Sequence, residues 1–88
     1  MTAFYEVGVA PAAVRAVRSL HDSDRATAKW LLDSLELMSS DPETGDTSVV
    51  SAELGLRKRN IGDYKVLYQI REERATIVVL AIERRRGR

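Results

Sequence analysis

The chain has 88 residues, of which 44% are hydrophobic, with no cysteine, one histidine and a formal net charge of +1. A chain of this length forms one small domain, and this composition excludes disulfide frameworks and Cys/His zinc sites. No apolar run is long enough to span a membrane, and no basic leader precedes a long apolar stretch. We therefore expect a single domain over residues 1–88, located in the cytoplasm, without a metal or other cofactor.

The net charge hides an uneven distribution along the chain. Residues 1–54 carry four Lys or Arg against nine Asp or Glu, and residues 55–88 carry ten against four, which gives balances of −5 and +6. An asymmetry of this kind between two halves is typical of a protein whose basic half binds a polyanion. We expect the second half to carry the functional surface.

The first half predicts one strand and two helices. Residues 4–9 alternate in a strand pattern, and Pro11 suits the first turn of a helix that ends near His21. Ser23 or Asp24 can cap a second helix. Apolar residues recur at helical spacing in that helix: Ala28, Leu31, Leu32, Leu35 and Met38. The short connection predicts a helical hairpin packed on a sheet, with His21 between the helices and Trp30 as a packing residue.

The second half predicts three successive strands. Residues 39–48 form a polar loop, and residues 49–54 fit either a loop or a strand. Residues 56–60, 64–71 and 76–83 have strand patterns, joined by tight turns at Gly62-Asp63 and at residues 72–74. The predicted order is β-α-α-β-β-β, which is an α+β domain with its helices on one face of the sheet and its last three strands antiparallel.

The first of these turns gathers basic residues. If Gly62 and Asp63 form the turn, Asn60 lies opposite Lys65, and Lys58 lies opposite Leu67. Side chains alternate between the faces of a sheet, so Lys58, Asn60 and Lys65 would share one surface. Like charges this close destabilise a sheet unless an anion neutralises them, which makes the hairpin a candidate phosphate-binding surface.

The element order and two segments resemble the RelE/ParE superfamily, the toxins of bacterial type II toxin–antitoxin modules. The segments are Leu54-Gly55 and Gly62 to Ile70, GDYKVLYQI, and a basic pair follows the last strand in the expected place. In RelE-like members the resemblance implies a ribosome-dependent mRNA endoribonuclease, or mRNA interferase, which inhibits translation without a metal. Its partners would be the ribosome, mRNA and a cognate antitoxin that neutralises it. In the ParE branch it implies an inhibitor of DNA gyrase, and a non-catalytic relic that only binds the antitoxin is a third alternative.

The resemblance also implies roles for individual residues. Lys58 matches a catalytic basic position, Lys65 matches the arginine that stabilises the phosphate, and Arg85 matches the basic residue after the last strand. Four further residues are expected to bind RNA: Arg57, Arg59, Asn60 and Arg84.

The chain departs from the family pattern in three respects. A lysine at position 65 cannot bind a phosphate bidentately as arginine does. The three residues after Arg85 contain no tyrosine, although the family carries an acid–base group there. The strand before the turn also fails to alternate basic with apolar residues, and a one-residue bulge would bring Arg57 and Arg59 to the phosphate-binding face instead of Lys58 and Asn60. Both registers are open at this point, whereas Tyr64 and Tyr68 are expected in the core.

Overall fold

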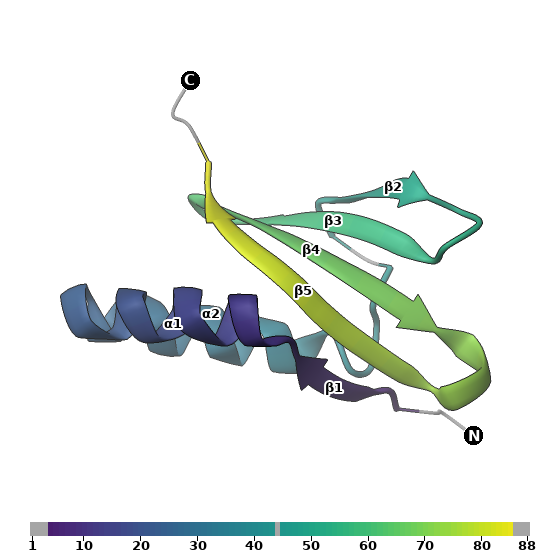
Figure 1. The fold of residues 1–88 in the computed structure, drawn as a ribbon, viewed down its shortest axis with the longest axis horizontal. Helices are drawn as coiled ribbons and strands as arrows, with labels where there is room; N and C mark the ends of the chain where they lie inside the picture. Colours follow the sequence, from purple (N-terminus) through teal and green to yellow (C-terminus); the bar gives the residue numbers. More distant parts are fainter. Residues whose placement is uncertain (1–3, 44, 86–88) are drawn as a thin grey trace.

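The computed structural model describes residues 4–43 and 45–85, which form a two-helix layer on one face of a five-stranded sheet (Figure 1). The elements are β1 (Glu6–Val9), α1 (Pro11–Ser23), α2 (Arg25–Leu37), β2 (Thr47–Ser51), β3 (Leu56–Ile61), β4 (Tyr64–Arg71) and β5 (Thr76–Arg84). The strand order is β1-β5-β4-β3-β2, with β1 parallel to β5 and the other neighbours antiparallel.

This architecture confirms the predicted α+β class and adds a strand to the predicted order. The extra strand β2 pairs with β3 through Thr47, Ser48 and Val49. The prediction of a polar loop over residues 39–48 was therefore wrong for Thr47 and Ser48, which belong to β2. Threonine and valine suit a pleated edge strand even where the surrounding loop is polar.

Caps set the boundary between the helices. The backbone N–H of Asp24 still donates to the carbonyl of Leu20, so α1 continues through His21, and the prediction that His21 lies between the helices was wrong. Asp24 then caps α2, because its carboxylate accepts hydrogen bonds from the N–H and the hydroxyl of Thr27 at 3.1 and 2.6 Å. These two bonds lower the pKa of the Asp24 carboxyl. Neither described helix has the length and apolar character needed to cross a membrane.

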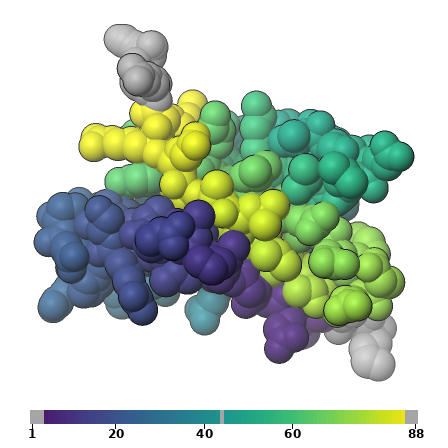
Figure 2. Space-filling model, in the orientation of Figure 1, coloured from purple at the N-terminus to yellow at the C-terminus, as the bar shows by residue number. Residues whose placement is uncertain are grey.

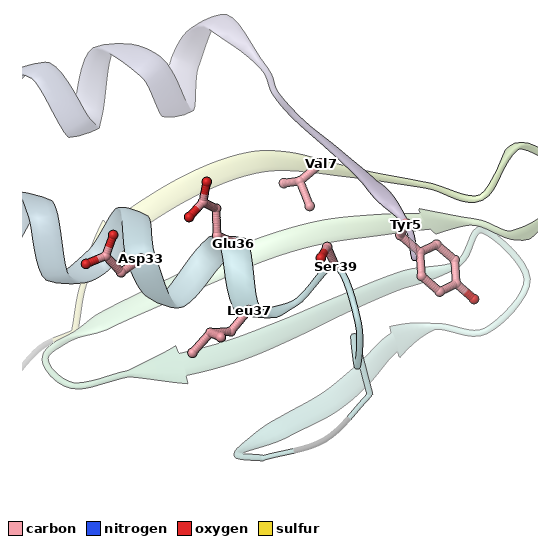
Figure 3. A pocket seen from close by; sticks show the side chains of 6 residues that line it. All are labelled: Tyr5, Val7, Asp33, Glu36, Leu37 and Ser39. Carbon is pink, nitrogen blue, oxygen red and sulfur yellow. The ribbon is translucent and has the colours of Figure 1, made fainter. Parts of the chain in front are cut away.

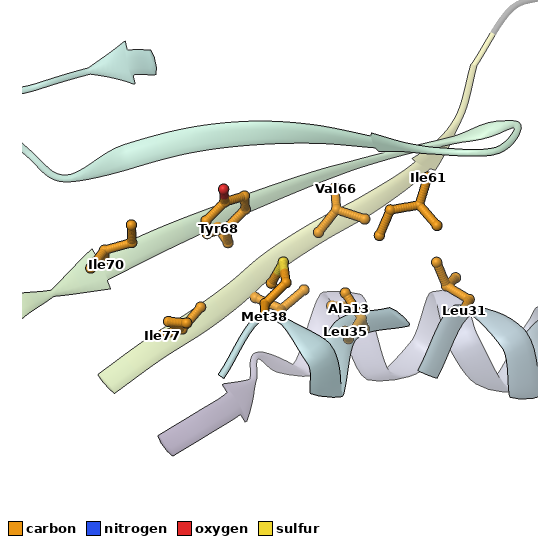
Figure 4. Close-up of a cluster of buried hydrophobic side chains, with 10 residues drawn as sticks. Ala13, Leu31, Leu35, Met38, Ile61, Val66, Tyr68, Ile70 and Ile77 are labelled. Carbon is orange, nitrogen blue, oxygen red and sulfur yellow. The ribbon is translucent and has the colours of Figure 1, made fainter. Parts of the chain in front are cut away.

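The core lies between the helices and the sheet (Figure 4). The helical layer contributes Ala13, Leu31, Leu35 and Met38, and the sheet contributes Ile61, Val66, Tyr68, Ile70, Ile77 and Val79. Tyr68 is completely buried, which confirms its predicted place, and its hydroxyl donates to the carbonyl of Pro42 at 2.6 Å. Tyr64 is half-buried against the same cluster.

Two glycines hold the turns on either side of β3. Gly55 has φ +70°, and its carbonyl accepts the N–H of Ile70 at 2.8 Å. A Cβ at Gly55 would meet the carbonyl oxygen of Ile70. Gly62 has φ +57°, and a Cβ there would lie 2.7 Å from the ring of Trp30. Trp30 therefore packs on the β3–β4 turn, as a packing residue with 47% of its surface exposed.

We expect Gly55→Ala to lower the free energy of unfolding by at least about 2 kcal/mol, because alanine is strained at this φ and its Cβ collides with backbone. Gly8→Ala is the matched control, since a Cβ at Gly8 meets no atom within 4 Å. Urea denaturation of both variants measures the difference. Equal losses of stability in the two variants would contradict this account of the turn.

Candidate functional site

The β3–β4 hairpin has the register without a bulge. Asn60 lies opposite Lys65 and Lys58 opposite Leu67, and the ladder is continuous from the turn to Leu56. These four residues face away from the helices, on a surface that we call the open face. The alternative register, with Arg57 and Arg59 on this face, was wrong because β3 carries no bulge against β4.

A cavity of about 300 Å³ lies on the open face. Its lining comes from four strands and consists of Val50, Lys58, Lys65, Leu67, Ala81 and Glu83. A second hollow of about 540 Å³ adjoins it and is lined by Lys65, Glu83, Arg84 and Arg85. Because Lys65 and Glu83 line both, the two hollows are neighbours, and we call the pair the basic hollow.

Arg85 is held at the rim of the basic hollow by the hairpin turn. Its backbone N–H donates to the carbonyl of Asp63 at 2.6 Å, and its Nη1 donates to the carbonyl of Gly62 at 3.1 Å. The sequence predicted that Lys58, Lys65 and Arg85 act together. The structure brings Lys65 and Arg85 to one hollow and Lys58 to the adjoining one.

The other predicted RNA-binding residues separate into two groups. Arg84 lines the basic hollow, and Asn60 lies on the open face, where its amide donates to the carboxylate of Asp46 at 3.0 Å. Arg57 and Arg59 lie opposite Tyr68 and Val66, on the helix side of the sheet.

The side chains of both arginines lie away from the basic hollow. The Nε of Arg57 donates to Thr47 Oγ1 at 3.4 Å. The guanidinium of Arg59 packs close to Gly45, and its Nη1 is buried without a hydrogen-bond partner among the described residues. An RNA contact by Arg57 or Arg59 would have to form on the opposite face from Lys58 and Lys65.

Glu83 is a site residue that the sequence reasoning missed. It lies directly opposite Lys65, because a bulge between Leu67 and Tyr68 shifts the β4–β5 register by one residue. In a register without that bulge, Ile82 would lie opposite Lys65. The alternating pattern of residues 76–83 carries no signal for the bulge, so it did not reveal that Glu83 lies opposite Lys65.

A larger cavity of about 630 Å³ lies on the helix side, between the end of α2 and the β1 segment (Figure 3). Its lining includes Asp33, Glu36 and the 74%-exposed Leu37, and none of the basic residues of the hairpin. In the space-filling view the helices gather on one side of the molecule and β2–β5 on the other (Figure 2). No three His, Cys, Asp or Glu side chains cluster as metal ligands within residues 4–43 and 45–85. The basic hollow is therefore the better candidate for binding an anion.

Comparisons with known proteins identify the family of the chain and proteins of similar fold. The sequence model of the family described as "ParE toxin of type II toxin-antitoxin system, parDE" matches residues 7–88. The chain is similar to the RelBE2 toxin–antitoxin complex of Mycobacterium tuberculosis, with a TM-score of 0.80 and 23% identity over 97% of this chain and 95% of that one. It is also similar to the archaeal RelE–RelB complex of Pyrococcus horikoshii OT3, with a TM-score of 0.76 and 26% identity over 97% of each chain.

The isolated E. coli RelE toxin has a TM-score of 0.76 and 15% identity, over 96% of this chain and 87% of that one. No curated protein sequence matches significantly. The likenesses below 25% identity show a shared fold, and the match over residues 7–88 shows the family.

If the basic hollow binds phosphates, the double variant Lys58→Gln/Lys65→Gln should bind a single-stranded oligonucleotide more weakly. Two lost phosphate contacts should reduce the slope of log K against log salt by about 1.4. The matched control is Arg15→Gln/Arg18→Gln, which removes the same charge from exposed positions on α1. Fluorescence anisotropy titrations at several salt concentrations give the slopes. The same weakening in both double variants would indicate a response to net charge alone.

Proposed function

The chain belongs to the ParE toxin family of type II toxin–antitoxin systems, and we propose that this toxin acts as a ribosome-dependent mRNA endoribonuclease. The observation that carries the proposal is the convergence of Lys58, Lys65 and Arg85 at the basic hollow on the open face. The similarity in fold between this chain and RelE proteins also supports the ribonuclease proposal. Cleavage of translated mRNA would stop growth until a cognate antitoxin covers the toxin.

The chemistry suits a site made of cations. A ribose 2′-hydroxyl attacks the adjacent phosphate, so the nucleophile is part of the substrate and the protein has to stabilise charge and transfer protons. The phosphorane carries more negative charge than the ground-state phosphodiester. Lys65 and Arg85, at one end of the basic hollow, would stabilise that charge, and Lys58 would bind from the neighbouring strand.

A second candidate function is the one named for the ParE branch, inhibition of DNA gyrase through a protein–protein contact. The family description itself favours it, since the matching model is that of ParE toxins. Under this alternative the exposed basic residues would bind a protein surface and no bond of RNA would be broken. The two candidates differ in whether single charges of the basic hollow are needed for a chemical step.

We expect the double variant Lys65→Ala/Arg85→Ala to lose toxicity in growing cells. Each lost electrostatic donor should raise the barrier by about 3 kcal/mol, so the rate of cleavage of ribosome-bound mRNA should fall at least roughly a hundredfold. Arg15→Ala/Arg18→Ala is the control with the same change of charge.

Circular dichroism and thermal melting of the double variant check the fold, because the Arg85 side chain also bonds the hairpin turn. Full toxicity of a folded Lys65→Ala/Arg85→Ala variant would contradict the ribonuclease mechanism.

The partner that silences this toxin should be complementary to the open face. We propose an antitoxin whose acidic, amphipathic C-terminal region is disordered alone and folds across Lys58, Lys65 and Arg85, or displaces the segment that carries Arg85. Several crystallised proteins with this fold are toxin–antitoxin complexes. In the described part of the sheet β2 is an edge strand with exposed Val49 and Val50, so the bound segment could extend the sheet as well as form a helix.

We expect the association rate of toxin and antitoxin to fall as salt rises, since opposite charges steer the encounter. Stopped-flow mixing over a range of ionic strength measures this rate. Lys58→Gln/Lys65→Gln should reduce the salt dependence, whereas Arg15→Gln/Arg18→Gln should not. A rate that is indifferent to salt, with amide shifts confined to the helices, would rule out the open face as the docking surface.

A further inference from the structure

Glu83 is a carboxylate inside a basic site, and no role above uses it. It lies at the end of β5, directly opposite Lys65, and it lines both parts of the basic hollow. Its residue surface is exposed, and the salt bridges found among the described residues do not include it. The charged groups that share the hollow with it are Lys58 from β3, Lys65 from β4, and Arg84 and Arg85 at the end of β5.

We propose that Glu83 is the general base of the cleavage reaction, an assignment that rests on the proposed ribonuclease function. The carboxylate takes the proton of the 2′-hydroxyl while the O2′–P bond forms. The P–O5′ bond then breaks, and the leaving O5′ receives a proton from the ammonium group of Lys58. The products are a 2′,3′-cyclic phosphate and a 5′-hydroxyl, and exchange with water returns Glu83 and Lys58 to their starting forms.

The chemistry of the lining favours Glu83 for this step. Ammonium and guanidinium groups have no lone pair with which to accept a proton, so protonated lysines and arginines stabilise charge or donate. Of the six residues that line the cavity of about 300 Å³, all of them described, Glu83 is the one with a carboxylate. A carboxylate accepts a proton directly, whereas an ammonium group must first lose one.

The position of Glu83 also fits. Residues directly opposite on antiparallel strands have Cβ atoms about 5 Å apart. A phosphate bound by Lys65 would therefore place its neighbouring ribose beside Glu83, with the two groups on either side of the reacting O2′ and phosphorus. Proton transfer by a positioned base contributes about 10²- to 10⁴-fold to a rate.

A purely electrostatic role for Glu83 makes the opposite prediction. If the carboxylate only neutralises Lys65 and keeps the basic strands together, its removal should strengthen RNA binding and leave the chemical step intact or faster. A general base affects the chemical step and its pH dependence. Measuring binding and turnover separately therefore distinguishes the two roles.

The test uses the intact toxin carrying Glu83→Gln and single-turnover cleavage of mRNA on programmed ribosomes. We expect the maximal rate to fall at least a hundredfold, while the half-saturating toxin concentration stays the same or decreases. The wild type should lose rate toward acid pH, this loss should be absent in Glu83→Gln, and Glu83→Asp should recover part of the rate. Glu73→Gln, an exposed carboxylate in the turn after β4, is the matched control and should cleave normally.

Circular dichroism and thermal melting verify that Glu83→Gln is folded. An active wild type with an unchanged or faster Glu83→Gln variant would overturn the assignment and leave the ribonuclease proposal standing. A wild type that fails to cleave on ribosomes would overturn both.

Discussion

Gly62 adopts a left-handed backbone conformation at the turn between β3 and β4, and the ring of Trp30 packs against it. That turn fixes which residue of β3 lies opposite which residue of β4. Because side chains alternate between the faces of a sheet, a slip of one residue would exchange the two sets of side chains. Lys58 would turn toward the helices and Arg59 toward solvent. The register, and with it the position of every charge on the open face, depends on a turn held by a residue of α2.

The basic charges on the open face repel one another when no anion is bound there. Lys58, Lys65 and Arg85 border the basic hollow, and repulsion between such groups opposes folding. Glu83, which lines both parts of the basic hollow, offsets part of this repulsion. The same carboxylate would repel a phosphate, so its place in the proposed RNA site is best explained if it takes part in the proposed reaction. Asp33 and Glu36 lie apart from the basic hollow, beside the cavity near α2. Asp46, from the loop before β2, accepts a hydrogen bond from Asn60 on the open face.

The sequence predicted the features that local patterns determine. Strand alternation in residues 64–71, helical spacing through Met38 and the Gly62-Asp63 turn were sufficient for the α+β fold and for the pairing of Asn60 with Lys65. The end of α1 at Ser23 depends on a local bond from the Asp24 N–H to the Leu20 carbonyl, which the pattern did not reveal. Two features depended on tertiary structure. Residues 47–51 form a strand because β3 offers a partner, and Glu83 lies opposite Lys65 because of a bulge. Because of this bulge, the sequence pattern did not identify Glu83 as a residue of the candidate site.

The central claim is that this toxin breaks mRNA rather than acting on DNA gyrase. Its most direct test is to express the wild-type chain in growing cells and to map new 5′-hydroxyl ends of mRNA together with DNA breaks. The account predicts abundant ends within translated codons, fewer ends when translation initiation is blocked, and intact chromosomal DNA. Gyrase-linked DNA breaks with intact mRNA would contradict it and would assign the chain to the gyrase-inhibiting branch of its family.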